Sequence, residues 1–137
     1  MQVFFYFSLI CGKEYDKMNA NLEIWRINMV FDIKNEKSED IPNFKGGEKF
    51  FRAKMHYDGM NRFLHGTLVP GATIGEHLHD TNSEIIYFLS GKGSVIYDGQ
   101  RLAVEAGQCH YCPKGHSHSL VNDGDEKLVF FAVVPNQ

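Results

Sequence analysis

Three histidines and one glutamate have the residue types and the spacing of a metal site. His77 and His79 stand two apart, Glu84 follows after a short polar run, and His118 lies much further along the chain. Neutral imidazole and carboxylate are the ligands that a borderline divalent metal prefers. Because these four side chains come from three separate segments, only a fold that brings the segments together can use them as one site.

Strand geometry offers a way to bring these side chains together. Residues two apart on a strand point to the same face, so His77 and His79 present both imidazoles on one side. A polar turn follows, after which Glu84 opens the next strand and its carboxylate can return toward the same pair. His118 comes after a turn at 113–115, which can aim its side chain inward.

The composition describes a globular domain. The chain has 137 residues, of which 43% are hydrophobic and 13% aromatic, so it is long enough for one domain with a real core. Its net charge is −3, and its lysines and arginines are scattered. No nucleic-acid motif accompanies them, so we expect no binding of DNA or RNA. Three cysteines make an odd count that fits no disulfide framework, and we therefore expect a reducing cytoplasm.

The first residues need a separate interpretation. Residues 3–11 are apolar and resemble an export signal, but no lysine or arginine precedes them and no small-x-small cleavage site follows. The stretch is too short to span a bilayer, so we expect no membrane partner. The alternative is a β-strand rich in Phe and Tyr, covered by its own sheet or by a partner subunit. A third interpretation is that Met18 or Met29 is the natural start.

Short runs of alternating or β-branched residues, broken by Gly, Asn, Asp and Pro, favour strands over helices throughout the chain. Asp98-Gly99 predicts a tight hairpin, whereas the polar stretch 34–47 predicts a loop or a short helical turn. Many short strands at close spacing indicate a sandwich or a barrel, and nothing in the sequence indicates a second domain. The expected strands are 3–10, 22–31, 48–57, 62–69, 73–79, 84–90, 93–98, 101–105, 109–113, 117–122 and 127–134.

Two motifs give the chain a family resemblance. The first is Gly, five residues, His-x-His, four residues, Glu, six residues, Gly; the second is Gly, five residues, Pro-x-Gly, two residues, His, three residues, Asn. The chain matches both without a departure and resembles the cupin superfamily over residues 44–134. The matching residues are Gly71, His77, His79, Glu84 and Gly91 in the first motif, and Gly107, Pro113, Gly115, His118 and Asn122 in the second.

The resemblance implies an all-β fold, an antiparallel jelly-roll β-barrel over residues 44–137, with residues 1–43 as an additional N-terminal strand segment and loop. Three nitrogen ligands and one oxygen ligand suit Mn, Fe, Ni, Co or Zn, and the sequence does not indicate which of these metals is bound. Small cupins pair through their outer sheets, so we also expect a homodimer, with or without exchanged N-terminal strands. The resemblance further implies one divalent metal inside the barrel, bound by His77, His79, Glu84 and His118.

Two cysteines and a histidine close to the second motif look functional. Cys109 and Cys112 form a CxxC pattern, but opposite parity on a strand points them to opposite faces, so we interpret them as packing residues. His116 shares the parity of His118 and is the candidate proton donor and acceptor, with a surface role as the alternative.

Three further histidines carry no clear assignment. His65 lies on a strand with no distinctly apolar face and stays ambiguous, and we interpret His56 and His110 as surface or packing residues.

Apolar residues are expected to line the interior beside the metal. Phe51 and Met55 share the apolar face of one strand, and Phe88 shares the parity of Glu84 on another. They form either plain core or an apolar pocket with the metal at its base. The sequence shows no inward arginine pair for a phosphate or dicarboxylate, which weakens a sugar-phosphate isomerase and favours a small, weakly charged ligand bound to the metal.

Two classes of function remain open. A metalloenzyme would use the metal as a Lewis acid or redox centre to decarboxylate, isomerise or oxygenate a small carboxylate, enediol or phenol. A non-catalytic module would bind a small molecule as a sensor or store. No carboxylate dyad or serine with a base is evident, so an enzyme would rely on the metal and on His116, Tyr87 or Tyr111. We favour the enzyme.

Overall fold

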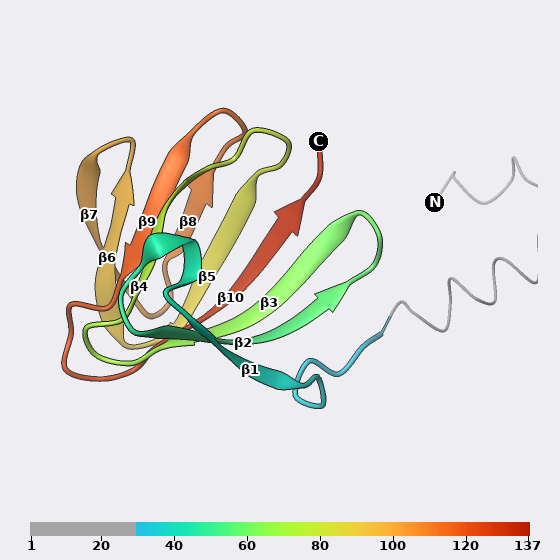
Figure 1. The fold of residues 1–137 in the computed structure, drawn as a ribbon, viewed down its shortest axis with the longest axis horizontal. Helices are drawn as coiled ribbons and strands as arrows, with labels where there is room; N and C mark the ends of the chain where they lie inside the picture. Colours follow the sequence, from blue (N-terminus) through green and yellow to red (C-terminus); the bar gives the residue numbers. More distant parts are fainter. Residues whose placement is uncertain (1–29) are drawn as a thin grey trace, which may run out of the picture. The chain divides into compact units, whose positions relative to one another are not determined.

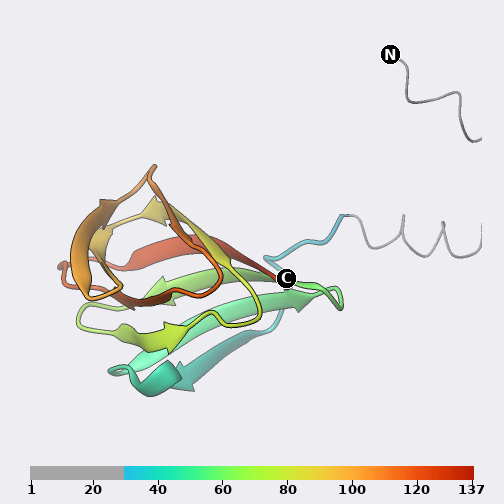
Figure 2. The same ribbon diagram turned by 90° about the horizontal axis from the view of Figure 1, so that it is seen from above.

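Two antiparallel β-sheets pack face to face in residues 33–137 of the computed structural model, which describes residues 30–137 (Figures 1 and 2). The six-stranded sheet has the order β1 (Ser38–Pro42), β2 (Phe50–Tyr57), β3 (Asn61–Leu68), β10 (Leu128–Pro135), β5 (Glu84–Ser90), β8 (Cys109–Cys112). The four-stranded sheet has the order β4 (Thr73–Leu78), β9 (Ser117–Val121), β6 (Lys92–Tyr97), β7 (Gln100–Glu105).

Strict alternation of buried and half-buried residues along β10 shows how the core forms. β10 is the last strand, yet it lies between β3 and β5, so its inward side chains meet residues from both ends of the described chain. Phe130 stacks on Phe51 with ring centroids 5.8 Å apart. Gly66 makes room for that pair, because a Cβ there would lie 2.3 Å from the Phe130 ring. Burial of one such ring contributes about 1.5–3 kcal/mol to folding.

The expected all-β jelly-roll fold is confirmed, and so is the hairpin between β6 and β7. Asp98 has φ 46° and Gly99 has φ 82°, the pair of positive angles that a type I′ turn requires. The expected strands from 48 onward correspond to β2 to β10 with ends shifted by a few residues.

The expectation that residues 34–47 form a loop or a helical turn is wrong for Ser38–Pro42. These residues form β1, an edge strand that pairs with β2, and the short 3-10 helix η1 (Phe44–Gly46) follows. β1 has a single large apolar residue, Ile41, so hydrophobic alternation could not reveal it. Its charged side chains act across the ladder instead, where Arg52 donates two hydrogen bonds, of 2.6 and 2.8 Å, to Asp40.

The strands expected at 3–10 and 22–31 fall wholly or largely outside the described residues, and the division of the chain at residues 43 and 44 stays a prediction. Across residues 30–137, no helix has the length and apolar character needed to cross a membrane.

Candidate metal centre

A β-bulge in β4 aims the first histidine into the barrel. Ile74 pairs with Leu120 and His77 pairs with His118, so β4 has one more residue than β9 between these two pairs. Plain alternation from the buried Ile74 would turn His77 outward. The additional residue restores its inward direction, and a bulge of this kind is a common way to re-aim a side chain at a site.

The four predicted ligands converge on one point. The three histidine Nε2 atoms lie 3.8, 3.2 and 2.9 Å from Glu84 Oε2, in the order His77, His79, His118. His118 Nε2 is also 3.0 Å from His79 Nε2 and 3.2 Å from His77 Nε2. One donor atom from each residue lies within 4.8 Å of all the others, and three of the four residues are buried. The side chains are therefore positioned to bind a metal ion.

The far side of each imidazole is held by another group. His77 Nδ1 lies 2.8 Å from the Gly75 carbonyl oxygen, and His79 Nδ1 contacts the Asn82 side-chain oxygen. Since these oxygens can only accept, each Nδ1 carries the proton and donates it. In the neutral form of each ring, the Nε2 lone pair is then left to face the common point, which is the arrangement that orients histidine ligands in metal sites.

His110 holds the third imidazole, a contact more specific than the surface or packing role that the sequence suggested. Its Nε2 lies 3.0 Å from His118 Nδ1, and the two rings stack with centroids 5.2 Å apart. Burial and the neighbouring His118 lower the pKa of His110 to about 4. His110 is therefore neutral at neutral pH, and its Nε2 can accept a hydrogen bond from His118 Nδ1. The missing signal was the register of β8, which pairs His110 with the inward Ile86.

The carboxylate is stabilised as an anion within this cluster. Burial would raise the pKa of Glu84, but hydrogen bonds from His118, His77 and His79 hold that pKa well below its ordinary value. The hydrogen bond to Glu84 in turn raises the pKa of His79 against the cost of burial. A proton that His79 holds at Nε2 would have to leave when a metal binds there, because imidazole ligates in its neutral form.

A cavity of about 480 Å³ opens over the four ligands. Phe51 and Met55 line it as expected, together with Phe44, Leu64 and Val134 and the ligands themselves. Phe88 lies outside this lining and is fully buried in the core. Much of the lining is therefore apolar, with the four ligands gathered at one place, as in a small-molecule site.

Two cations also line this cavity, one arginine and one lysine, although the sequence showed no inward arginine pair. Arg62 stands on β3 with the inward parity of Leu64, at the start of the strand. Lys45 comes from η1. Sequence alternation on β3 contained the signal for Arg62, since it shares its parity with the buried Leu64, Gly66 and Leu68.

The other functional candidates lie away from the cavity lining. His116 Nδ1 is 2.6 Å from Asp98 Oδ2, and the ring stacks on Tyr97. Tyr87 and Tyr111 are exposed on neighbouring strands of the six-stranded sheet. None of the three is among the residues that line the metal cavity.

The cysteines of the CxxC pattern point to opposite faces. Cys109 is exposed, Cys112 is buried, and both are free thiols. Burial raises the pKa of the Cys112 thiol to about 11, so it stays protonated and is a poor metal ligand.

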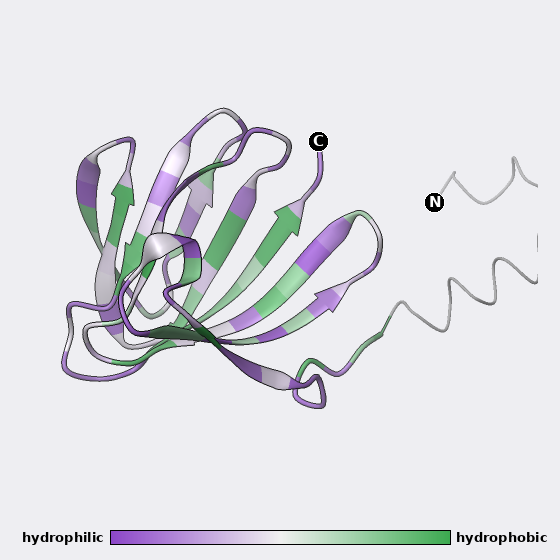
Figure 3. Cartoon of the chain, in the orientation of Figure 1, coloured by the Kyte–Doolittle hydropathy of each residue, from purple (hydrophilic) through white to green (hydrophobic). Residues whose placement is uncertain are grey.

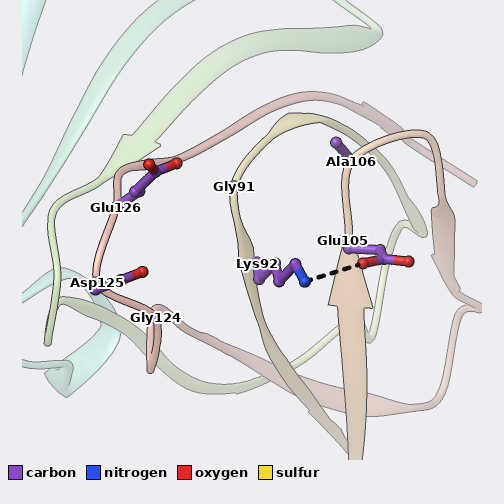
Figure 4. Close-up of a pocket in the computed structure, with 7 residues that line it drawn as sticks. All are labelled: Gly91, Lys92, Glu105, Ala106, Gly124, Asp125 and Glu126. Atoms are coloured by element: carbon purple, nitrogen blue, oxygen red, sulfur yellow. Dashed lines mark ion pairs between the residues drawn. The ribbon is translucent and has the colours of Figure 1, made fainter.

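A second pocket lies at the other end of β5, away from the four ligands (Figure 4). Figure 4 shows Asp125 and Glu126 on the loop before β10, and the ion pair between Lys92 and Glu105, which measures 3.7 Å. Its lining contains no histidine or cysteine and no large apolar side chain.

Known proteins resemble the chain in sequence and in structure. A family model described as a cupin domain matches residues 64–134. The oxalate-binding protein of Thermotoga maritima is 30% identical over 102 residues, which cover 70% of this chain and 84% of that protein. A glucose-6-phosphate isomerase of Thermococcus gammatolerans is 29% identical over 119 residues, or 77% of this chain, but the match spans only 53% of the isomerase.

Among solved structures, a predicted oxalate decarboxylase from Thermotoga maritima matches with a TM-score of 0.74 and 30% identity. The match covers 80% of this chain and 100% of that one. The resemblance in structure therefore extends beyond the segment that the family model covers.

Proposed function

The chain belongs to the cupin family, as its two motifs predicted, and we propose that it is a metal-dependent protein that binds a small carboxylate at the metal. The observation that carries the proposal is the convergence of three Nε2 atoms on Glu84 Oε2 while each Nδ1 is held by another group. The donor set of three imidazoles and one carboxylate suits Mn, Fe, Ni, Co or Zn. The printed name of the oxalate-binding relative supports a carboxylate as the ligand.

We propose further that the bound carboxylate is a substrate. A divalent metal at this site, held by His77, His79, Glu84 and His118, would supply Lewis-acid polarisation or redox chemistry with dioxygen. The apolar walls around Phe51 and Leu64 exclude water from the ligand, and His110 keeps the third imidazole in the orientation that ligation needs. Reactions that fit are decarboxylation, isomerisation or oxygenation, with an enediol or a phenol as the alternative to a small carboxylate as substrate.

A non-catalytic carboxylate-binding module is the second candidate, and one observation favours it. His116, the expected proton donor and acceptor, is bound to Asp98 and does not line the cavity. The name of the relative from Thermotoga maritima likewise speaks of binding. Turnover of a panel of carboxylates, enediols and catechols by the metal-loaded protein separates the two candidates.

The experiment that tests metal binding is elemental analysis of protein purified without chelators, followed by titration with oxalate. We expect one equivalent of a divalent transition metal and saturable oxalate binding. His77→Ala and His118→Ala should lose stoichiometric metal, whereas His65→Ala, which removes an imidazole outside the cluster, should keep it. Full metal retention in either ligand variant would refute the assignment.

We also propose a homodimer that pairs through the outer face of the six-stranded sheet. Ile85, Tyr87 and Leu89 alternate along β5 with 42%, 46% and 45% exposure, and Tyr111 on the neighbouring β8 is 53% exposed. Figure 3 shows long apolar stretches along β5 and β10, two neighbouring strands of this sheet. A second copy would remove these side chains from water.

We propose a cytoplasmic location, which localisation of a tagged full-length chain would test. The free thiols of Cys109 and Cys112 suit a reducing compartment.

A further inference from the structure

Two cations line the metal cavity from different elements of the fold. Arg62 belongs to β3 in the six-stranded sheet, while Lys45 belongs to η1, which packs on β4 of the four-stranded sheet. Figure 2 shows η1 beside β4. The cavity lies between these two walls, and the four metal ligands also line it. A ligand bound at the metal would therefore lie in a cavity whose lining carries two positive side chains.

Lys45 is held in place by two close backbone contacts. A Cβ at Gly75 would lie 2.0 Å from the Lys45 carbonyl oxygen, and a Cβ at Gly47 would lie 2.2 Å from the Thr73 carbonyl oxygen. The turn can therefore dock on β4 because glycine stands at both positions. Lys45 itself has φ 57°, and its Nζ lies 5.8 Å from the centre of the Phe44 ring. These contacts fix the base of the side chain at the edge of the cavity.

Arg62 is also supported at the cavity wall. Its guanidinium carbon lies 5.7 Å from the centre of the Tyr57 ring, and the two residues are partners in the β2–β3 ladder. The Tyr57 hydroxyl donates a 2.8 Å hydrogen bond to the Gly59 carbonyl, which holds the ring. Within residues 30–137, neither Arg62 nor Lys45 forms an ion pair with a carboxylate. Both charges are thus left for a ligand.

The charge balance of the cavity favours an anion with two negative groups. Besides Glu84, the single acidic residue in the lining is Asp80. With a divalent metal bound, the positive charge of the metal, Lys45 and Arg62 exceeds that of these two carboxylates by two units. Opposite charges attract more strongly near a protein wall than in bulk water, so a dianion gains more from this cavity than a monoanion.

We infer that Lys45 and Arg62 form an anion subsite beside the metal, so the ligand is a small dicarboxylate with one acidic group at the metal ligands and the other at these cations. The inference rests on the proposed function and names its substrate class. It also replaces the weakly charged ligand that the sequence favoured for want of an inward arginine pair, because the structure places one arginine and one lysine at the cavity. A guanidinium binds carboxylate with two parallel hydrogen bonds, which gives Arg62 the larger role in orientation.

The test uses the full chain loaded with one equivalent of Mn²⁺ and titrated with malonate or acetate at fixed ionic strength. We expect malonate to bind more tightly than acetate. Arg62→Gln and Lys45→Gln should each weaken malonate binding about tenfold or more, since a hydrogen bond to a charged group contributes about 1.5–3 kcal/mol. Acetate binding should change less than about twofold in the same variants. Metal content should be unchanged, because neither residue is a ligand.

Two further variants make the result specific. Lys92→Gln removes the same charge at the second pocket and should leave malonate binding unchanged. Arg62→Lys keeps the charge but loses the paired hydrogen bonds, so it should bind malonate with intermediate affinity. This variant also tests the subsite if Arg62→Gln fails to fold. Equal malonate affinity in the wild type, Arg62→Gln and Lys45→Gln would overturn the subsite while leaving the proposed function intact. Failure of the metal-loaded wild type to bind any carboxylate would overturn both.

Discussion

The Nε2 atom of His110 lies 3.0 Å from the Nδ1 atom of His118, on the side of that imidazole that faces away from Glu84. This contact decides which nitrogen of His118 carries a proton. With Nδ1 donating to His110, Nε2 is free to ligate, and the ring cannot rotate without losing the bond. His110 is therefore a positioning residue of the metal centre.

Replacing His110 by Phe should weaken metal binding about 10–100-fold, the usual cost of losing a partner of a ligating histidine. The phenyl ring preserves the packing against His118 but offers no acceptor. His110→Gln, whose side-chain oxygen can accept the same bond, should recover part of the affinity. Competition with a chelator of known affinity measures the effect, with His65→Phe as the matched control. Equal metal affinity in His110→Phe and the wild type would remove His110 from the metal centre.

Gly75 should be intolerant of a side chain because the Lys45 carbonyl oxygen occupies the space of its Cβ. We expect Gly75→Ala to lose about 1–3 kcal/mol of unfolding free energy by overpacking. It should also weaken metal binding, because the bulge that aims His77 must shift. Chemical denaturation and metal titration check the two effects.

Gly46→Ala provides the control for that substitution. Gly46 has φ 80° with nothing within 4 Å of a built Cβ, so alanine there meets backbone strain of about 1–2 kcal/mol without a clash. Its metal affinity should match that of the wild type. If both alanine variants bind metal equally well, the contact at Gly75 does not position His77.

Metal affinity should rise with pH across the neutral range. The Glu84 contact raises the pKa of His79 above its ordinary 6.5, so protons compete with the metal below that raised value. Chelator competition at pH 5.5, 6.5 and 7.5 measures the trend. A metal affinity that is the same at all three pH values would contradict the competition between the metal and a proton on His79.

The metal-free protein should show the opposite dependence above pH 6.5. A raised histidine pKa contributes stability that is complete below 6.5 and fades as pH rises through the raised value. The lowered pKa of Glu84 makes its contribution fade only in acid, as pH falls through that lowered value. Unfolding of the metal-free wild type should therefore become easier from pH 6.5 to 8, and Glu84→Gln should flatten that slope. Parallel slopes in the two proteins would argue against the His79–Glu84 pair.

Tyr87→Lys should convert the proposed dimer into a monomer. Two copies that pair through β5 would bring the new charges into an apolar interface, where an unpaired charge is costly. Mass in solution, measured by light scattering over a range of concentrations, reports the change. Leu102→Lys is the matched control because Leu102 is 44% exposed on β7 of the other sheet. Dissociation by the control variant, or a monomeric wild type, would reject this interface.

Much of this arrangement could be predicted from the sequence, for a physical reason. Side chains along a strand alternate between its two faces. Once the strands were recognised, the His-x-His pair and the apolar runs therefore indicated which face of each strand points inward. The spacing of the two motifs then led to the jelly-roll fold, which the structure confirms. His77 nevertheless reaches the interior through a bulge that simple alternation does not contain.

The remaining details depend on contacts between segments far apart in the chain. The inward direction of His110 follows from the pairing of β8 with β5, and the position of Lys45 follows from the docking of η1 on β4. β1 escaped notice because it shows no hydrophobic alternation: it is held by its ladder with β2 and by Ile41, which packs against the core. Long-range pairing decides each of these features, and local residue types do not encode it.

The four ligands do not all belong to one sheet. His77 and His118 lie on strands of the four-stranded sheet, whereas Glu84 lies on β5 of the six-stranded sheet. An ion bound by these residues would link the two sheets, and its binding free energy would add directly to the stability of the fold. The lifetime of the folded chain would then follow the supply of metal around it.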